Sequence, residues 1–304
     1  MIKHRLVWAA VCGLLLLSGT AQAKDETIIA HRGDSGHAPE NTLAAFRQAV
    51  AAKADYFELD CHFSKDGQVI ISHDGDLERT TGKKVNIADL SLAELAAYDV
   101  GTWFDPKFAG EKLPTLAQSL DVATRRCGVY VEIKAQAGDG KASQALVKRS
   151  AGEKALTPAL RQELLAMADA AATRSPDLTR ACIREIRAKK MEKRVVIQSF
   201  SPLICLVALC EAPEIRTELL ISEDKDHPEH FPRLVDFGML VGVKGFNANK
   251  DSLSAERLAV FQKAGKSVAV WTLNEPAEWA KFRGMGVDGI ITNFPAECRA
   301  AGGK

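Results

Sequence analysis

The chain has 304 residues, of which 26 % are charged and 46 % hydrophobic, an ordinary globular composition that excludes a disordered or collagen-like chain. Its 40 Lys and Arg residues are matched by 39 Asp and Glu residues. No strong net charge therefore attracts it to nucleic acid or to an anionic membrane, and we expect no nucleic-acid partner.

The first 23 residues have the pattern of a secretory signal peptide. Lys3 and Arg5 precede an apolar run from Leu6 to Leu17, and Ala21-Gln22-Ala23 has the small residues of a cleavage site. The run is shorter than the roughly 20 apolar residues that span a bilayer, and no later segment approaches that length. We expect residues 24–304 to form one exported domain, periplasmic or secreted, without stable membrane insertion.

Six cysteines follow the predicted signal peptide, an even number that suits an oxidising compartment. They are Cys61, Cys127, Cys182, Cys205, Cys210 and Cys298. One or more disulfides are compatible with this count, but the sequence does not define their pairing. Cys205 and Cys210 share a predicted helix, about a turn and a half apart, which is a poor geometry for a bond between them.

Short β-branched or aromatic runs alternate with longer helical patterns, as is typical of βα units around a parallel sheet. Eight such runs occur, at residues 27–31, 56–60, 129–134, 195–198, 214–221, 241–246, 267–272 and 289–292. A turn at Lys65-Asp66-Gly67 leads to an extension of the second run at residues 68–73. Eight units in a chain slightly longer than about 250 residues predict an α/β fold, a single (β/α)8 TIM barrel.

Two stretches interrupt this alternation and predict rim insertions after strands two and three. The first covers residues 75–116 and the second residues 135–179. The second contains Thr157-Pro158, an N-cap followed by proline at the first helical position. Leu160, Leu164 and Met167 then fall on one helical face. We expect one extra helix on the barrel rim there.

Charged and titratable residues gather at the ends of the first three predicted strands, where barrel enzymes place catalytic groups. These residues are His31, Arg32, Glu58, Asp60, His73, Glu132 and Lys134. Two residues separated by two positions on a strand lie on the same face, as Glu58 and Asp60 do. We therefore expect the seven side chains to share one mouth of the barrel.

Three carboxylates at one mouth are costly through burial and mutual repulsion unless cations balance them. Oxygen-only ligands favour a hard ion, so we expect Glu58, Asp60 and Glu132 to bind one divalent cation, Ca²⁺ or Mg²⁺, rather than Zn²⁺. The alternative is that these acids form salt bridges with Arg32 and Lys134 and bind no metal.

The remaining groups of this set suit acid–base chemistry on a phosphate. His31 and His73 are of a residue type that titrates near neutrality and serves as general acid or base. Arg32 and Lys134 offer cationic donors for phosphate oxygens, Arg through its bidentate fork and Lys as a point charge.

A series of ordered motifs runs from residue 27 to residue 296. The series comprises His31-Arg32-Gly33, Pro39-Glu40-Asn41-Thr42, Glu58-Leu59-Asp60, Lys65-Asp66-Gly67, His73-Asp74, Leu77-Glu78-Arg79-Thr80-Thr81-Gly82, Leu113-Pro114-Thr115-Leu116, Glu132-Ile133-Lys134, Gln198-Ser199-Phe200, Val270-Trp271-Thr272-Leu273-Asn274 and a last motif at residues 286–295. In order and spacing these motifs resemble the glycerophosphodiester phosphodiesterase family.

The resemblance implies hydrolysis of a small-molecule glycerophosphodiester to sn-glycerol 3-phosphate and an alcohol, within glycerol and lipid metabolism. The resemblance implies that His31 and His73 are the catalytic pair. It implies that Glu58, Asp60 and Glu132 are the metal ligands, and that Arg32 and Lys134 contact the phosphate. Cys61 replaces an aliphatic residue usual in the family, on the outward face of its strand. The insertion after Lys134 is also longer than the family pattern predicts.

Weaker candidates surround this set. Phe200 and Trp271 end predicted strands at the mouth, where each either covers the glycerol of the substrate or packs in the barrel, and we take both as candidate substrate-binding residues. His62 is expected behind the acidic cluster or in solvent, and the charged segment 223–230 as a solvated loop. Asp34 is expected to contact the turn after the first strand.

Two other functions remain open at this point. One is a lysophospholipase D-like or phosphoinositide-type phosphodiesterase, which ranks second because no basic amphipathic segment for a membrane surface is present. The other is a non-catalytic exported protein that binds a phosphodiester. Such a protein has no need of His31 and His73 beside an acidic cluster.

Overall fold

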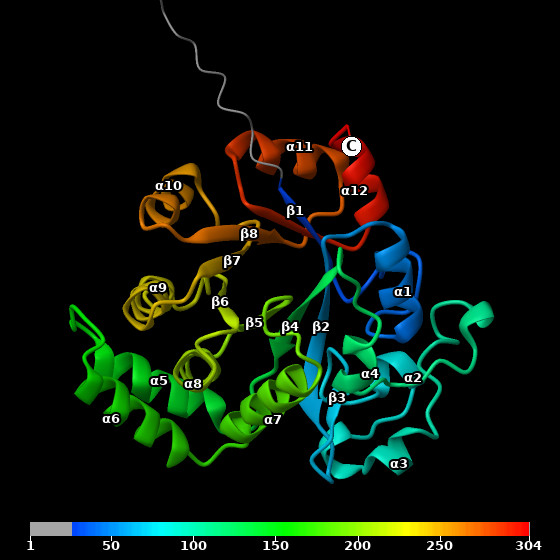
Figure 1. The fold of residues 1–304 in the computed structure, drawn as a ribbon, viewed down its shortest axis with the longest axis horizontal. Helices are drawn as coiled ribbons and strands as arrows, with labels where there is room; N and C mark the ends of the chain where they lie inside the picture. Colours follow the sequence, from blue (N-terminus) through cyan, green and yellow to red (C-terminus); the bar gives the residue numbers. More distant parts are fainter. Residues whose placement is uncertain (1–25, 304) are drawn as a thin grey trace, which may run out of the picture.

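Eight parallel strands close into a barrel in the computed structural model, which describes residues 26–303 (Figure 1). They are β1 (Thr27–Ala30), β2 (Tyr56–Phe63), β4 (Gly128–Ile133), β5 (Val195–Ser199), β6 (Arg216–Ile221), β7 (Gly245–Asn249), β8 (Ser267–Trp271) and β9 (Gly289–Thr292). The sheet closes because β1 pairs with β2 on one side and with β9 on the other. The predicted TIM barrel is confirmed, while the predicted signal peptide lies outside the described residues.

A ninth strand, β3 (Val69–Ile71), pairs antiparallel with the end of β2. This hairpin carries β2 beyond the barrel and accounts for the extension predicted at residues 68–73. The first insertion packs against this hairpin. It contains α2 (Glu78–Thr81), α3 (Leu92–Leu95) and two 3₁₀ turns, Ile87–Asp89 and Pro106–Phe108, and it leads into α4 (Leu116–Leu120). Ile70, Leu77, Ile87 and Leu95 give this lobe a small core of its own.

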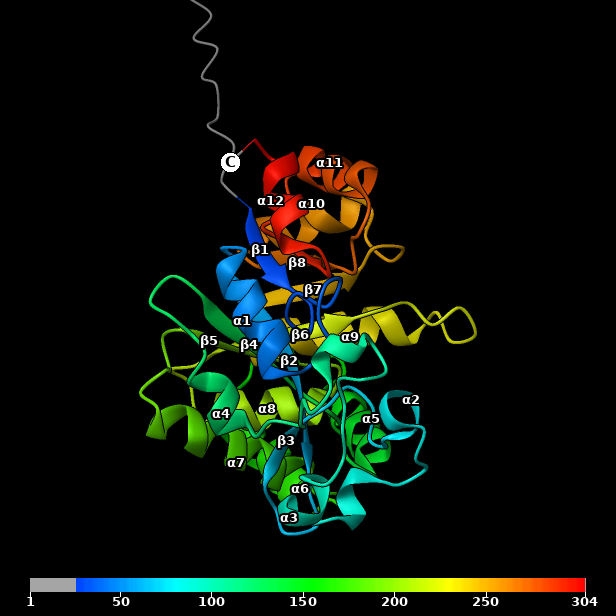
Figure 2. The ribbon, with the colours of Figure 1, turned by 90° about the vertical axis from the view of Figure 1, so that its right-hand side faces the viewer.

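The remaining helices surround the strands. They are α1 (Leu43–Ala51), α5 (Asp139–Ser150), α6 (Pro158–Asp169), α7 (Ser175–Ala188), α8 (Pro202–Glu211), α9 (His230–Val241), α10 (Ala255–Lys263), α11 (Pro276–Met285) and α12 (Pro295–Ala301). Figure 2 shows α2 and α3 at the end of the molecule opposite α11 and α12. Among residues 26–303, no helix is long and apolar enough to cross a membrane.

The second insertion corrects one prediction. It holds two additional helices, α5 and α6, before α7, and these pack against the outside of α8 (Figure 1). Only α6 has the apolar face and the Thr157 N-cap that the sequence shows clearly. Helix α5 is polar on average, and Leu146 and Val147 are its only large apolar residues, so few apolar positions in the sequence mark it as a buried helix.

The strand predicted at residues 241–246 is placed too early. Helix α9 continues to Val241 and ends at Gly242, whose φ of 85° is the left-handed conformation typical of a helix C-cap. Strand β7 starts only at Gly245. Val241 is the last residue of α9, and Val243 lies in the turn that follows. In the sequence alone, these two apolar residues resemble the start of a buried strand.

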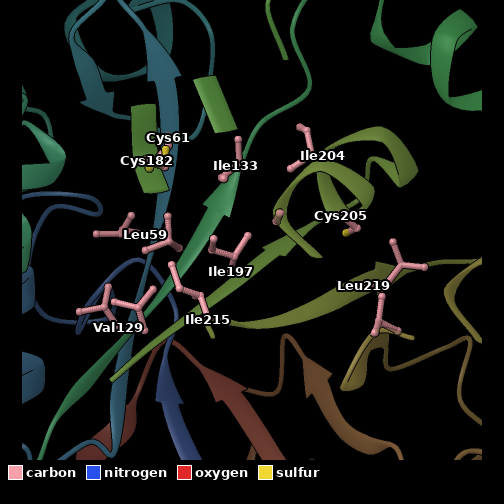
Figure 3. Packing of buried hydrophobic residues seen from close by; sticks show 14 of the residues in the cluster. Leu59, Cys61, Val129, Ile133, Cys182, Ile197, Ile204, Cys205, Ile215 and Leu219 are labelled. Atoms are coloured by element: carbon pink, nitrogen blue, oxygen red, sulfur yellow. The ribbon is translucent and has the colours of Figure 1, made fainter. Parts of the chain in front are cut away.

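The largest apolar core lies between the outward faces of the strands and the helices, and Figure 3 shows a part of it. Leu59 and Cys61 point outward from β2 into this core, as the period of two predicts. The thiol of Cys61 lies against the thiol of Cys182 from α7 (Figure 3). All six cysteines of residues 26–303 are unpaired, so the disulfides considered from the sequence do not occur in this structure.

Candidate active site

The turn after β1 places the first two site residues over the barrel mouth. Arg32 and Gly33 both adopt positive φ, 58° and 83°. A Cβ atom on Gly33 would lie only 2.7 Å from the backbone carbon of Ala45, so this turn needs glycine for conformation and for space. The turn also aims the Arg32 backbone N–H at Glu58 Oε2, to which it donates a hydrogen bond of 2.9 Å.

The seven side chains predicted from the sequence come together. Six of them line one cavity of about 100 Å³ at the mouth: His31, Arg32, Glu58, His73, Glu132 and Lys134. The seventh, Asp60, is 1 % exposed and contacts Lys134 Nζ at 2.8 Å through Oδ1. The strand-end positions therefore converge on one site, as barrel geometry requires.

The acidic cluster is buried and dense. Ligand oxygens of Glu58, Asp60 and Glu132 all lie within 4.8 Å of one another. Burial, together with the charge of Asp60, raises the pKa of Glu58 well above its usual value and that of Glu132 to about 7. Burial alone would raise the pKa of Asp60 too, but the charges of Lys134 and Arg32 lower it strongly. An all-carboxylate donor set under this repulsion fits a hard divalent cation.

Two cations share the site with these acids. Lys134 forms salt bridges with both Asp60 and Glu132. Arg32 approaches Asp60 with Nε at 3.6 Å from Oδ2. The salt bridges considered as an alternative to a metal are thus present. When all three carboxylates are ionised, the two cations leave one negative charge unbalanced, so the salt bridges and a bound cation are compatible.

Each histidine is held through one ring nitrogen. His31 Nδ1 lies 2.7 Å from Asn293 Oδ1, and His73 Nδ1 lies 2.8 Å from Asp74 Oδ1. Because both partners are oxygen acceptors, both Nδ1 atoms donate, and Nε2 is the nitrogen left for proton exchange. Burial and then the charge of Arg32 lower the pKa of His31 to about 4. Burial also lowers the pKa of His73, so neither histidine titrates as high as an exposed one.

Phe200 and Trp271 lie in the wall of the same cavity. Their rings meet edge to face with centroids 5.5 Å apart, and the Trp271 indole N–H donates to the Asn247 carbonyl at 2.9 Å. Phe200 is 42 % exposed, which is unusual for a large apolar side chain. The two rings form an apolar wall at the mouth, and Trp271 also packs against the apolar cluster that contains Ile29 and Ile291.

The weaker candidates fall outside this cavity. His62 lies within hydrogen-bonding distance of the His73 carbonyl, at 3.2 Å, and is not part of the acidic cluster. Asp34 contacts His37 within the turn after β1. Residues 223–229 form an exposed loop, as predicted, and His230 is the first residue of α9.

Several partners of the site residues were not assigned a role from the sequence. Asn41 donates to Asp60 Oδ2 at 2.7 Å, Glu40 accepts from Arg32, and Asn293 and Asp74 hold the two histidines. All four lie inside the motifs noted above. Their presence in these motifs could have marked them as candidate site residues. Their contacts could not be predicted, because they depend on loop geometry and join residues up to 262 positions apart.

Charged groups at the carboxyl ends of the strands of a closed parallel barrel define a (β/α)8 barrel enzyme, and this set suits a phosphate ester as substrate. The family model of the glycerophosphoryl diester phosphodiesterase family matches residues 31–157 and 158–297. The chain belongs to this family and is an enzyme of the phosphoric diester hydrolase class.

Individual relatives agree with this assignment. The chain is 29 % identical over 269 residues to a glycerophosphodiester phosphodiesterase of Caldanaerobacter subterraneus subsp. tengcongensis, covering 88 % of this chain and 94 % of that protein. A 70-residue stretch, 23 % of this chain and 22 % of the relative, is 54 % identical to human lysophospholipase D GDPD1. An Oleispira antarctica phosphodiesterase, solved in complex with the product sn-glycerol-3-phosphate, has the same fold: TM-score 0.73, 23 % identity, 91 % of this chain and 97 % of that one.

Proposed function

We propose that this enzyme hydrolyses glycerophosphodiesters to sn-glycerol 3-phosphate and an alcohol, with a divalent cation and with His31 and His73 as the proton-transfer groups. The observation that carries the proposal is the convergence of two histidines, three carboxylates and two cations on one cavity at the barrel mouth. The product bound to the Oleispira antarctica relative supports glycerol 3-phosphate as the product here.

Glu58, Asp60 and Glu132 would hold the cation, Ca²⁺ or Mg²⁺, through carboxylate oxygens. When bound, the ion supplies positive charge to the phosphate oxygens in the transition state. Arg32 and Lys134 flank the same cavity and bind the phosphate from the protein side. Phe200 and Trp271 cover the glycerol carbons with their exposed ring surfaces.

The surroundings of the two histidines differ, and the difference assigns their roles in the proposal. With a pKa near 4, His31 is neutral at neutral pH and accepts on Nε2 the proton of the nucleophile, which is either water or the 2-hydroxyl of the glycerol. Attack by water gives glycerol 3-phosphate directly, whereas attack by the 2-hydroxyl gives a cyclic phosphate that a water molecule then opens. Burial lowers the pKa of His73 too, but the charge of Asp60 and the hydrogen bond from Nδ1–H to the Asp74 carboxylate act in the opposite direction and favour a protonated ring. His73 therefore gives a proton from Nε2 to the oxygen of the leaving alcohol.

The test is product analysis with purified residues 24–304 and glycerophosphocholine. We expect glycerol 3-phosphate and choline, loss of turnover with EDTA, and recovery with Ca²⁺ or Mg²⁺. His31→Ala and His73→Ala should each lower kcat by about 10²-fold or more. His227→Ala, which changes an exposed loop histidine, should leave kcat unchanged.

Full turnover in chelated enzyme would contradict the metal, and near-normal kcat in either histidine variant would remove that residue from the mechanism. Tight binding of glycerophosphocholine without any turnover would favour the non-catalytic binding protein. Export is tested separately: expressed full-length chain should appear outside the cytoplasm with a mass that begins after Ala23.

A second substrate class, lysophospholipids, is favoured by a groove beside the site. A cavity of about 800 Å³ lies between α5 and α9, with Val147, Phe231 and Leu234 among its apolar walls. It reaches Pro202 and Ser222, each two residues beyond a residue of the catalytic cavity wall, Phe200 and Leu220 respectively. We propose that this groove holds the acyl chain when the glycerol carries one.

Comparison of two substrates tests this second proposal. Val147→Glu and Leu234→Glu should lower kcat/KM for lysophosphatidylcholine and leave kcat/KM for glycerophosphocholine unchanged. Val260→Glu, at a 59 % exposed position of α10, is the matched control for an added surface charge. Equal effects on both substrates would reject the groove as an acyl site.

A further inference from the structure

Arg79 has no part in the reaction proposed above, although it lies in one of the ordered motifs. It is the second residue of α2, in the first insertion, and does not line the catalytic cavity. Its guanidinium nevertheless uses all three nitrogens. Nε donates to Asp74 Oδ2 at 2.7 Å, and Nη1 and Nη2 donate to the two oxygens of Glu40 at 2.8 Å each.

The first partner of Arg79 controls a histidine. Asp74 accepts from Arg79 with Oδ2 and from His73 Nδ1 with Oδ1. Burial tends to raise the pKa of Asp74, but the hydrogen bonds from His73 and Arg79 outweigh it and lower that pKa. Asp74 is therefore a carboxylate with one oxygen for each neighbour, and its orientation fixes the plane of the His73 ring.

The second partner controls the phosphate contact. Glu40 Oε1 accepts from Arg79 and also from Arg32 Nη1, the latter at 2.9 Å. Burial would raise the pKa of Glu40, yet the hydrogen bonds and charges of Arg79 and Arg32 lower it. Glu40 therefore stays ionised and joins two guanidinium groups, one inside the cavity and one outside.

We propose that Arg79 is a positioning residue that fixes the separation between His73 and Arg32, acting through Asp74 and Glu40. This inference rests on the proposed function. Arg32 follows β1 and His73 follows β3, and no hydrogen bond joins them directly in the described part of the chain. The guanidinium has the planar fork needed to engage Asp74 and both oxygens of Glu40 at once, whereas a lysine presents a single point charge.

This role is separable from a role in stability. The Arg79 side chain is 43 % exposed, and exposed ion pairs contribute little to folding free energy. Arg149 offers a matched control, since its Nε and Nη2 each contact Glu163 at 2.6 Å and its side chain is 38 % exposed. Arg149 lies on α5 and contacts no catalytic residue.

The experiment compares Arg79→Ala, Arg79→Lys and Arg149→Ala in the presence of saturating Ca²⁺ or Mg²⁺. Two substrates are used: glycerophosphocholine, whose alcohol needs a proton to leave, and the p-nitrophenyl ester of glycerol 3-phosphate, whose phenolate leaves without one. Arg79→Ala should lower kcat for glycerophosphocholine by about 10-fold or more, as loss of a group that orients a catalytic side chain does. The loss should be smaller with the p-nitrophenyl ester, because His73 is not needed as an acid there.

Variants of Asp74 and Glu40 separate the effect of Arg79 on His73 from its effect on Arg32. Asp74→Asn should reproduce the dependence on the leaving group, and Glu40→Gln should mainly raise KM through Arg32. Arg79→Lys should recover less than half of the lost kcat, and free guanidinium ion should partly restore Arg79→Ala. Arg149→Ala should match the wild type in every assay.

Unchanged kcat in Arg79→Ala, or an equal loss with both substrates, would overturn the inference. So would full recovery in Arg79→Lys, which tests the same point if the alanine variant does not fold. An inactive wild-type enzyme on both substrates would instead reject the proposed function. The two failures are therefore distinct.

Discussion

At the scale of single residues, the candidate site depends on side chains that orient its members through hydrogen bonds. Glu58, Asp60 and Glu132 lie on strands, where the period of two fixes their direction, and this part of the site was predictable. Asn293 and Asn41 hold His31 and Asp60 from loops. The partner of a loop side chain depends on the geometry of the turn, so these two residues could be placed in a motif but not assigned a role from the sequence alone.

Gly33→Ala should be strongly destabilising. The new Cβ would lie 2.7 Å from backbone atoms of Ala45, in a residue with φ of 83°. Gly67→Ala is the matched control, because Gly67 has a similar φ of 77° and no atom within 4 Å of its Cβ position. We expect about 1–2 kcal/mol for Gly67→Ala from left-handed strain alone. Urea unfolding should show a clearly larger loss for Gly33→Ala, and equal losses would contradict the steric argument.

Stability should fall as the pH is lowered from about 6.5 toward 4, in part through His31. Its pKa is about 4 in the folded protein and near 6.5 when unfolded, so the unfolded state binds more protons in this window. The effect is up to about 3 kcal/mol for this shift. His31→Gln removes the titration, so its unfolding free energy should depend less on pH. Parallel curves for the variant and the wild type between pH 7 and pH 4 would exclude His31 as a source.

At the scale of elements, predictability followed the strength of the periodic signal. The strands of the barrel are buried on both faces and read as short apolar runs, so nearly all were located within two residues. The predicted start of β7 was four residues too early, because Val241 at the end of α9 and Val243 in the following turn are both apolar and buried. Helix α5 was missed because its composition is polar and it has few large apolar residues, while in the structure it packs against α8.

The start of α5 supplies a test of that tertiary contact. Asp139 is 2 % exposed and accepts from Ser143 Oγ at 2.9 Å and from Ser201 Oγ at 3.0 Å, which ties α5 to the start of α8. Asp139→Ala leaves two buried hydroxyls with a lost partner and should cost about 1–3 kcal/mol. Asp177→Ala, at an exposed position of α7, should cost much less. Thermal unfolding of both variants checks this, and equal melting temperatures would refute it.

At the scale of the whole molecule, a cation held by the acidic cluster would couple ion binding to folding, because the unfolded chain has no such site. Ca²⁺ or Mg²⁺ at 100 times its Kd should stabilise the protein by about 2.7 kcal/mol, visible as a higher Tm that EDTA reverses. Glu132→Gln should reduce this rise. Glu163→Gln, an exposed acid of α6, should not. If neither Ca²⁺ nor Mg²⁺ changes the Tm, this result would argue against a cation at Glu58, Asp60 and Glu132.

The pairing of β1 with both β2 and β9 has a consequence for how the chain is made. The first strand receives its second neighbour only when residues 289–292 exist, and His31 receives its anchor only with Asn293, 262 residues later. A nascent chain that ends before residue 289 has an open edge at β1 and no Asn293 to accept a hydrogen bond from His31. A translation product that stops before residue 289 therefore lacks both the closed sheet and the hydrogen bond that orients the His31 ring.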